Sequence, residues 1–169
     1  MSELLDWEFT ERWQERWTDW MKPGGHGALA DVRNERLAWT PLSKPLSECT
    51  VMLVTTGGVH LRTQEPFDVM KEDGDWSLRE IPCDTAPEAL MITHTHYNHL
   101  DADRDINVVF PIERLPELRD EGVIGDTART HFGLMGWVPN PTVTVRDTVP
   151  AMVATAKSEG VDIALMTPG

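Results

Sequence analysis

The densest group of potentially reactive side chains in the sequence is a histidine-rich stretch at residues 93–101, Thr-His-Thr-His-Tyr-Asn-His-Leu-Asp. Three imidazoles within six residues could bind a divalent metal such as zinc, because a neutral ring nitrogen is a common zinc ligand. A histidine could instead transfer protons, since its ordinary pKa of about 6.5 lies close to neutral pH. A third interpretation is structural, with these side chains hydrogen-bonding the loop. Metal binding, proton transfer and support of the loop are all open for this stretch.

The spacing His-x-His-x-Asn-His within this stretch resembles the metallo-β-lactamase signature His-x-His-x-Asp-His, which also follows a strand. A metal-dependent hydrolase that uses residues 94–99 is therefore one alternative function. Two differences weigh against it. Asn98 stands where the signature has a carboxylate, and His131 is the only histidine downstream, where that family needs two more and a bridging Asp. We therefore predict no metal site here.

Apolar runs predict the strands that would position the histidine-rich stretch. Residues 89–93 form one such run and lead directly into His94, and residues 50–56 and 161–166 form two more. Continuous β-branched and apolar runs are typical of strands that are buried on both faces in a parallel sheet. We therefore predict that these three strands are neighbours, and we predict a further short strand at residues 131–136.

The segments between these strands predict helices. One helix is expected at residues 111–120, with Pro116 delaying its start or bending it. The other is expected at residues 149–159, where Thr148 can cap the start and Gly160 can end the helix. Strands and helices in alternation indicate an α/β fold, a parallel sheet with flanking helices. The sheet is expected to be incomplete at the C-terminus, because the final strand lacks a covering helix.

The N-terminal region carries a helical pattern of its own. Apolar residues at spacings of four, four, four and three predict one face of an amphipathic helix: Leu5, Phe9, Trp13, Trp17 and Trp20. We therefore divide the chain into residues 1–45, a Trp-rich helix and an irregular connection, and residues 46–169, which contain the α/β domain.

Composition limits the partners of this chain. The net charge of −13 and the pI near 4.7 argue against nucleic acid, whose phosphates would repel this surface. No apolar stretch approaches the roughly 18 residues that a membrane span needs, and Met1 to Trp20 lack the pattern of a signal peptide. Cys49 and Cys83 cannot form a framework of several disulfides. These features predict a cytoplasmic protein without nucleic-acid or membrane partners.

Six segments of the chain match one family in order and spacing. They lie at residues 39–42, 51–61, 105–114, 121–125, 131–136 and 159–169, and include VMLVTTGGVHL at residues 51–61 and EGVDIALMTPG at residues 159–169. Together they resemble the selenoprotein B family of glycine, sarcosine, betaine and D-proline reductases. The D-proline reductase branch fits best.

In this family the segment that matches residues 166–169 is followed at once by selenocysteine, or by cysteine in some relatives, and then by a second cysteine two residues later. Selenocysteine is encoded by UGA, which ordinary translation reads as a stop. The resemblance therefore implies that the chain is truncated before its selenocysteine, that the codon after Gly169 is UGA, and that the 169-residue chain alone is inactive. A true stop and a trimmed chain are the alternatives.

The resemblance implies an oxidoreductase that cleaves a carbon–nitrogen bond alpha to a carboxylate. In the family, a pyruvoyl group on a partner subunit activates the amine, the selenolate displaces the nitrogen, and a dithiol supplies the electrons. The expected partners are therefore a pyruvoyl-containing reductase subunit, a dithiol electron donor and a small amino-acid-like substrate. No cofactor is expected in this chain itself. A non-catalytic assembly subunit is a further alternative.

The resemblance also indicates pocket residues. Amino-acid reductases keep counterparts of several residues of the histidine-rich stretch, but not of His96 and His99. We therefore predict His94, Tyr97 and Asp101 as catalytic residues, acting as proton donors or carboxylate binders, and Gly57, Gly58 and His60 as substrate-pocket residues.

Overall fold

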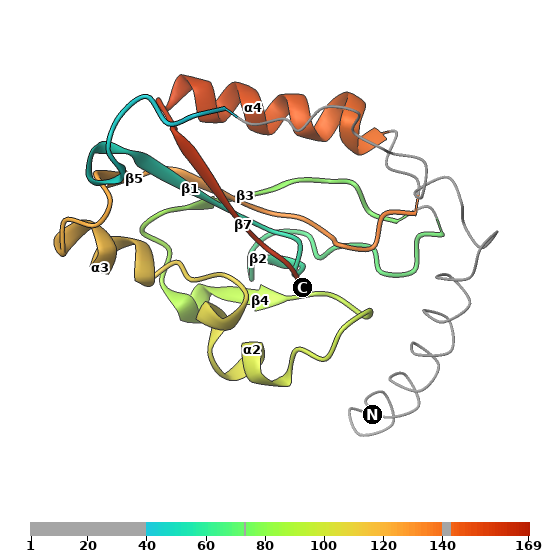
Figure 1. Ribbon diagram of the computed structural model, residues 1–169. Helices are drawn as coiled ribbons and strands as arrows, with labels where there is room; N and C mark the ends of the chain where they lie inside the picture. Colours follow the sequence, from blue (N-terminus) through green and yellow to red (C-terminus); the bar gives the residue numbers. More distant parts are fainter. Residues whose placement is uncertain (1–39, 73, 140–142) are drawn as a thin grey trace, which may run out of the picture. The chain divides into compact units, whose positions relative to one another are not determined.

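The computed structural model describes residues 40–72, 74–139 and 143–169 (Figure 1). The predicted N-terminal helix lies outside these residues, so the division of the chain at residue 45 stays a prediction. Leu42–Gly169 cluster into one unit, and this unit has a mixed α/β fold in which helices flank a largely parallel sheet. The predicted fold class is confirmed. In the described part of the chain, no helix is long and apolar enough to cross a membrane.

Strand β1 (Thr50–Thr55) forms the centre of the main sheet, and every residue in it after Thr50 is buried. Its side chains alternate between the two faces. Val51 and Leu53 join one apolar cluster, whereas Met52 and Val54 join another. Helix α4 (Val149–Ser158) covers one face, and α2 (Leu100–Arg104) and α3 (Arg114–Asp120) lie on the other (Figure 1). The apolar run at residues 50–56 is thus a strand buried on both faces, as predicted.

Three strands pair with β1 in parallel. Strand β7 (Ile163–Thr167) pairs along the whole of one edge. Two short strands share the other edge, β5 (Asp126–Thr127) beside the start of β1 and β6 (Thr130–Gly133) beside its end. Strand β3 (Arg79–Pro82), which the sequence analysis did not predict, then pairs with β6 in antiparallel orientation.

The break between β5 and β6 is filled by side chains. There the Leu53 N–H donates a hydrogen bond to the ring Nδ1 of His131 at 3.1 Å. On the other side of the break, the Glu159 carboxylate accepts from the backbone N–H groups of Arg129 and Thr130 at 2.8 and 3.1 Å. His131 is therefore a structural residue that completes the ladder of β1.

The strand predicted at residues 89–93 exists as β4 (Leu90–Ile92), but its predicted place beside β1 is wrong. It pairs in antiparallel orientation with β2 (Val59–Leu61) in a separate two-stranded sheet. The reason lies at Gly58, whose φ of +72° turns the chain out of the main sheet directly after β1. Leu90 and Ile92 are still buried, because the two-stranded sheet packs on the face of the main sheet that presents Val51 and Leu53.

The two predicted helices are confirmed as α3 and α4, with α3 starting three residues later than predicted, at Arg114. Gly160 follows α4 with a φ of +69°, as expected for a residue that ends a helix. The predicted cap at Thr148 is wrong, because a π-helical turn, η4 (Thr144–Thr148), runs into α4 and the Thr148 hydroxyl donates to the Trp76 carbonyl at 2.7 Å. Short 3-10 turns complete the unit: η1 (Leu46–Glu48), η2 (Pro87–Ala89) and η3 (Ile106–Val108).

Strand β7 is less buried than predicted for residues 161–166. Within the described residues it pairs only with β1, and the side chains of Leu165 and Met166 are 41% and 62% exposed. A strand edge with exposed apolar side chains invites pairing with another chain. The prediction of a buried final strand is therefore wrong for this unit.

This edge predicts self-association of the 169-residue chain. We expect a Met166→Lys variant to aggregate less than the unmodified chain, because a charge on an edge strand opposes strand pairing between molecules. Val153→Lys is the matched control, since it adds the same charge to a half-exposed position on α4. Light scattering during a thermal ramp measures the effect. Equal protection by both variants would point to a general effect of an added lysine rather than to the strand edge, and no protection by Met166→Lys would contradict an edge-driven process.

Candidate functional site

The carboxyl ends of β1 and β7 meet at one edge of the main sheet, where α/β folds commonly build their sites. The two strand ends are joined through Thr167, whose carbonyl accepts from the Thr56 N–H at 3.0 Å and from the Thr55 hydroxyl at 3.3 Å. Beyond them, Gly169 lies against Gly57, since a Cβ added at Gly169 would fall 2.3 Å from the Gly57 Cα. This close approach requires a residue without a side chain.

The histidine-rich stretch packs onto this edge through the predicted pocket glycines. A Cβ added at Gly58 would lie 2.4 Å from the Thr93 carbonyl oxygen, so only glycine fits there. Gly57 accepts a hydrogen bond from the Tyr97 hydroxyl at 2.8 Å. The structure therefore brings Gly57, Gly58, Tyr97 and the start of the histidine-rich stretch together.

His94 is the most buried residue of the stretch, with 6% of its surface exposed. Its Nδ1 accepts a hydrogen bond from the His96 backbone N–H at 3.0 Å, and its ring meets that of Tyr97 edge to face at 4.8 Å. Burial, with smaller effects from His96 and His99, lowers the pKa of His94 to about 4. At neutral pH the ring is thus uncharged.

Tyr97 is held as a neutral hydrogen-bond donor. Burial, assisted by the negative charge of Asp103, raises the pKa of Tyr97 to about 12. Its hydroxyl therefore stays protonated at neutral pH and donates a hydrogen bond to the Gly57 carbonyl. The phenol can position the strand tip or a ligand, but it is a poor acid or base near pH 7.

Asp101 lies apart from this group. It is an exposed residue of α2, with 82% of its side chain accessible, and its carboxylate pairs with Arg104 at 2.9 Å. A carboxylate in this environment is well solvated and contributes little to a pocket. The structure therefore joins two of the three predicted catalytic residues, His94 and Tyr97, but gives Asp101 no contact with either.

His60 contacts the start of the histidine-rich stretch at Thr93. It is fully buried, and its Nδ1 lies 2.8 Å from the Leu61 carbonyl, while its Nε2 lies 2.8 Å from the Thr93 hydroxyl. Because a carbonyl only accepts, Nδ1 carries the proton and Nε2 accepts from Thr93. Burial lowers the pKa of His60. The predicted pocket residue His60 thus holds Thr93, the residue before His94, in place.

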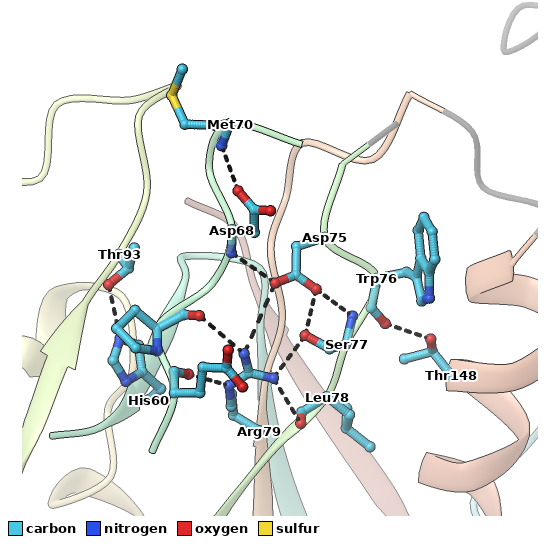
Figure 2. A network of polar contacts seen from close by, with 12 residues as sticks. His60, Asp68, Met70, Asp75, Trp76, Ser77, Leu78, Arg79, Thr93 and Thr148 are labelled. Carbon is cyan, nitrogen blue, oxygen red and sulfur yellow. Dashed lines mark hydrogen bonds and ion pairs between the residues drawn. The ribbon is translucent and has the colours of Figure 1, made fainter. Parts of the chain in front are cut away.

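Figure 2 shows the network behind His60, which is centred on Arg79 and Asp75. The guanidinium of Arg79 lies over the Phe67 ring at 4.4 Å, and Phe67 in turn meets the His60 ring at 5.8 Å. Asp75 accepts from the backbone N–H groups of Asp68 and Ser77. This network fixes the long segment between β2 and β3 against His60.

The other two histidines of the stretch face different partners. The His96 ring stacks on Trp137 at 4.5 Å with an interplanar angle of 9°, and His99 Nδ1 lies 2.8 Å from the Asp103 carboxylate. Among the described residues, no group of three or more His, Cys, Asp or Glu side chains is arranged to hold a metal ion. The three imidazoles are thus not gathered around one point.

We expect purified protein to hold no stoichiometric zinc or iron at this stretch, because His94 Nδ1 is occupied by a backbone N–H and no metal-binding group of side chains forms among the described residues. Elemental analysis after purification without chelators checks this. A stoichiometric metal that disappears in the double variant His94→Ala, His96→Ala would contradict the prediction.

Sequence reasoning missed two residues of the site, Gly136 and Trp137. A Cβ added at Gly136 would lie 3.3 Å from His94 Nε2, and Trp137 supplies the stacking surface for His96. The sequence signal that could have indicated Gly136 is its position at the end of a family-like segment, residues 131–136. His96 and Trp137 are 41 positions apart (96 to 137), so no local sequence pattern predicts their contact.

A separate cleft of about 660 Å³ lies between β4, α2 and η3, and it includes neither His94 nor Tyr97. Its lining mixes cations and carboxylates, among them Arg62, Glu88, Asp103 and Arg104. Arg62 and Arg104 are already bonded, to the Glu88 carbonyl and to Asp101. The cleft therefore lacks a cluster of like charges that would select a charged ligand. We consider the strand ends as the candidate site.

Comparison with known proteins shows that this chain is similar to the gamma subunits of two amino-acid reductases. The chain is 37% identical over 131 residues to D-proline reductase subunit gamma of Acetoanaerobium sticklandii, covering 78% of this chain and 53% of the relative. It is 27% identical over 139 residues to glycine reductase complex component B subunit gamma of Carboxydothermus hydrogenoformans, covering 79% and 31%.

These matches confirm the predicted resemblance to the glycine and D-proline reductases. The chain spans about half the length of the first relative and about a third of the second. No family model and no solved structure matches it.

Proposed function

We propose that this chain is the N-terminal part of a selenoprotein-B-like reductase subunit, which cleaves a carbon–nitrogen bond alpha to a carboxylate. The observation that carries the proposal is the 37% identity to D-proline reductase subunit gamma over 78% of the chain. The junction of the β1 and β7 ends supports it, because family-like segments at residues 51–61, 131–136 and 159–169 meet there around His94 and Tyr97.

In this proposal the described residues form the walls of the site, and the nucleophile comes from elsewhere. Neither thiol is suitably placed: Cys49 is buried at the amino end of β1, the opposite end from Gly57, and Cys83 directly follows β3. The proposed nucleophile is a selenocysteine or cysteine after Gly169, in the part of the relatives' length that this chain does not span. Such a residue would follow the strand tip that contacts Gly57 and Tyr97.

The proposed reaction needs partners. A pyruvoyl group on a partner subunit would activate the substrate amine, and the selenolate or thiolate would then attack the alpha carbon as the nitrogen leaves. A second thiol would then attack the selenium or sulfur, which breaks its bond to the alpha carbon, releases the deaminated carboxylate product after protonation and leaves a Se–S or S–S bond. A dithiol donor would reduce that bond and so restore the nucleophile. The proposed substrate is a small amino acid or its N-methylated form. A cytoplasmic location stays a prediction.

Reconstitution tests the proposal. The full-length product, expressed with read-through of the codon after Gly169 and assembled with its pyruvoyl-containing partner, is expected to cleave D-proline, glycine, sarcosine or betaine when a dithiol is present. Replacement of the residue after Gly169 by serine is the matched control and is expected to abolish turnover. A complex that cleaves none of these substrates, or a serine variant with full activity, would overturn the proposal.

The two alternatives give other outcomes. A metal-dependent hydrolase would bind stoichiometric metal and lose activity with chelators, and a non-catalytic assembly subunit would raise the activity of its partner without needing a nucleophile of its own. The arrangement of the three imidazoles does not favour the hydrolase, because the His96 ring stacks on Trp137 and His99 pairs with Asp103.

A further inference from the structure

Within the described residues, one nitrogen at the strand-end site has no hydrogen-bond partner. His94 Nε2 is buried, and nothing among the described residues bonds to it. Buried polar atoms are nearly always paired, since an unpaired one loses its bonds to water without compensation. Each such atom in a folded protein therefore calls for an explanation, and a bound ligand is one of the few available.

The hydrogen-bond pattern fixes the tautomer of His94. The His96 backbone N–H can only donate, so Nδ1, which it contacts at 3.0 Å, must offer its lone pair. In a neutral imidazole the proton then sits on Nε2. The unpartnered atom is therefore an N–H donor, and the backbone of the stretch holds it in that form.

The Nε2 atom itself has almost no exposed surface, and its neighbours include Gly136 and Tyr97. A side chain at position 136 would press on Nε2, with its Cβ only 3.3 Å away, and glycine stands there. On the other flank the ring of Tyr97 meets His94 at 4.8 Å, and Tyr97 itself touches Gly57 and Gly169 at the strand ends. The donor thus belongs to the same strand-end group as the proposed site.

We infer that His94, through its Nε2–H, binds a carboxylate oxygen of the substrate and does not act as a proton donor in the reaction. This rests on the proposed function. A charged acceptor suits the donor, because hydrogen bonds to ions are shorter and stronger than those between neutral groups. The lowered pKa of His94, about 4, agrees with this role, since a ring that is neutral at pH 7 donates a hydrogen bond but is no useful acid.

Two variants at one position separate the two roles. In His94→Gln the amide can place an N–H near the former Nε2, whereas in His94→Asn it reaches only the former Nδ1. In the reconstituted complex we expect His94→Gln to keep kcat/KM for its amino-acid substrate within roughly tenfold of the unmodified complex. His94→Asn should lose roughly tenfold to a hundredfold, mostly through a higher KM. The pH profile of kcat should be the same in His94→Gln as in the unmodified complex.

Nuclear magnetic resonance of the full-length chain with ¹⁵N-labelled histidine gives a readout that is independent of turnover. The His94 signals should report a proton on Nε2 between about pH 6 and 8, because a ring with a pKa of about 4 is neutral there. Addition of D-proline or acetate should shift the Nε2–H signal, and pyrrolidine, an amine without a carboxylate, should not.

Several results would overturn the inference. These are a proton on Nδ1, a signal that ignores both carboxylates, equal loss in the two variants, or a kcat profile in His94→Gln that loses an ionisation. If the complex cleaves no amino acid, the proposed function fails, and the carboxylate titration still decides whether His94 is a carboxylate donor. If the complex is active but the titration is flat, only the role of His94 fails.

Discussion

Lowering the pH from 7 to 4 is expected to remove about 6 kcal/mol from the free energy of unfolding, about 3 kcal/mol from each of two buried histidines. These are His94 and His131, which are 6% and 1% exposed and whose pKa burial lowers to about 4. Both rings accept a backbone hydrogen bond at Nδ1, from His96 and from Leu53, and a protonated ring cannot accept there.

The sign follows from proton uptake by the two states. In the unfolded chain each histidine takes up its proton near its ordinary pKa of about 6.5, whereas the folded state resists until about pH 4. The stabilisation is therefore complete above about pH 6.5 and is lost as the pH falls toward 4. His60, whose pKa burial also lowers, acts in the same direction. The carboxylates Asp75 and Glu159, whose pKa values are lowered, add their loss at still lower pH.

Urea denaturation between about pH 7.5 and about 4.5 measures the effect. This range lies above the ordinary pKa values of most carboxylates, so the histidines dominate the change. His131→Asn is the informative variant, because its amide oxygen can still accept from the Leu53 N–H but does not titrate. The variant should be less stable at pH 7, through lost packing, and its stability should depend less on pH. Unchanged stability of the unmodified protein down to pH 5 would contradict the prediction.

Gly58→Ala is expected to destabilise the protein by about 2–5 kcal/mol, the sum of left-handed strain and overpacking. Gly58 has a φ of +72°, and its added Cβ would meet the Thr93 carbonyl oxygen at 2.4 Å. Relief of this contact requires the start of the histidine-rich stretch to move away from β1. The reconstituted complex should therefore lose most of its activity even at temperatures at which the variant stays folded.

Gly122→Ala is the matched control for this substitution. Gly122 has nearly the same conformation, with a φ of +73°, but nothing lies within 4 Å of its added Cβ. The variant should lose only about 1–2 kcal/mol, the cost of a left-handed alanine, and should keep its activity. Comparison of the two melting temperatures and activities isolates the contact with Thr93. Equal effects of the two variants would show that this contact is unimportant.

Local patterns carried much of the fold and site. The apolar runs at residues 50–56 and 161–166 became parallel neighbours, and the helices at residues 111–120 and 149–159 formed nearly as expected. The histidine-rich stretch and the family resemblance led to His94, Tyr97 and Gly57, and in the structure Tyr97 contacts both His94 and Gly57. These features were accessible because each depends on residues close in sequence or on a motif.

Other features depended on which layers meet in space. Whether the run at residues 89–93 joins the main sheet or a second one is decided by the turn at Gly58, because both arrangements bury the same apolar side chains. The short strand β3 lacks an apolar run of its own, since its residues Arg79, Glu80 and Pro82 are only partly buried or exposed. Its strand character comes from pairing with β6.

The roles of individual histidines were decided in the same way. By sequence alone, His94, His96 and His99 are equivalent donors for a metal, but the tertiary structure gives each a different partner. The sequence determined the resemblance to reductase subunits, the main strands and helices, and the position of the histidine-rich stretch after a strand, because these are properties of local pattern and motif. Only the tertiary structure decided that Asp101 faces solvent, that His131 completes β1, and that His94 holds a buried N–H to which none of the described residues bonds. Burial and hydrogen-bond partners arise from contacts between segments far apart in the chain.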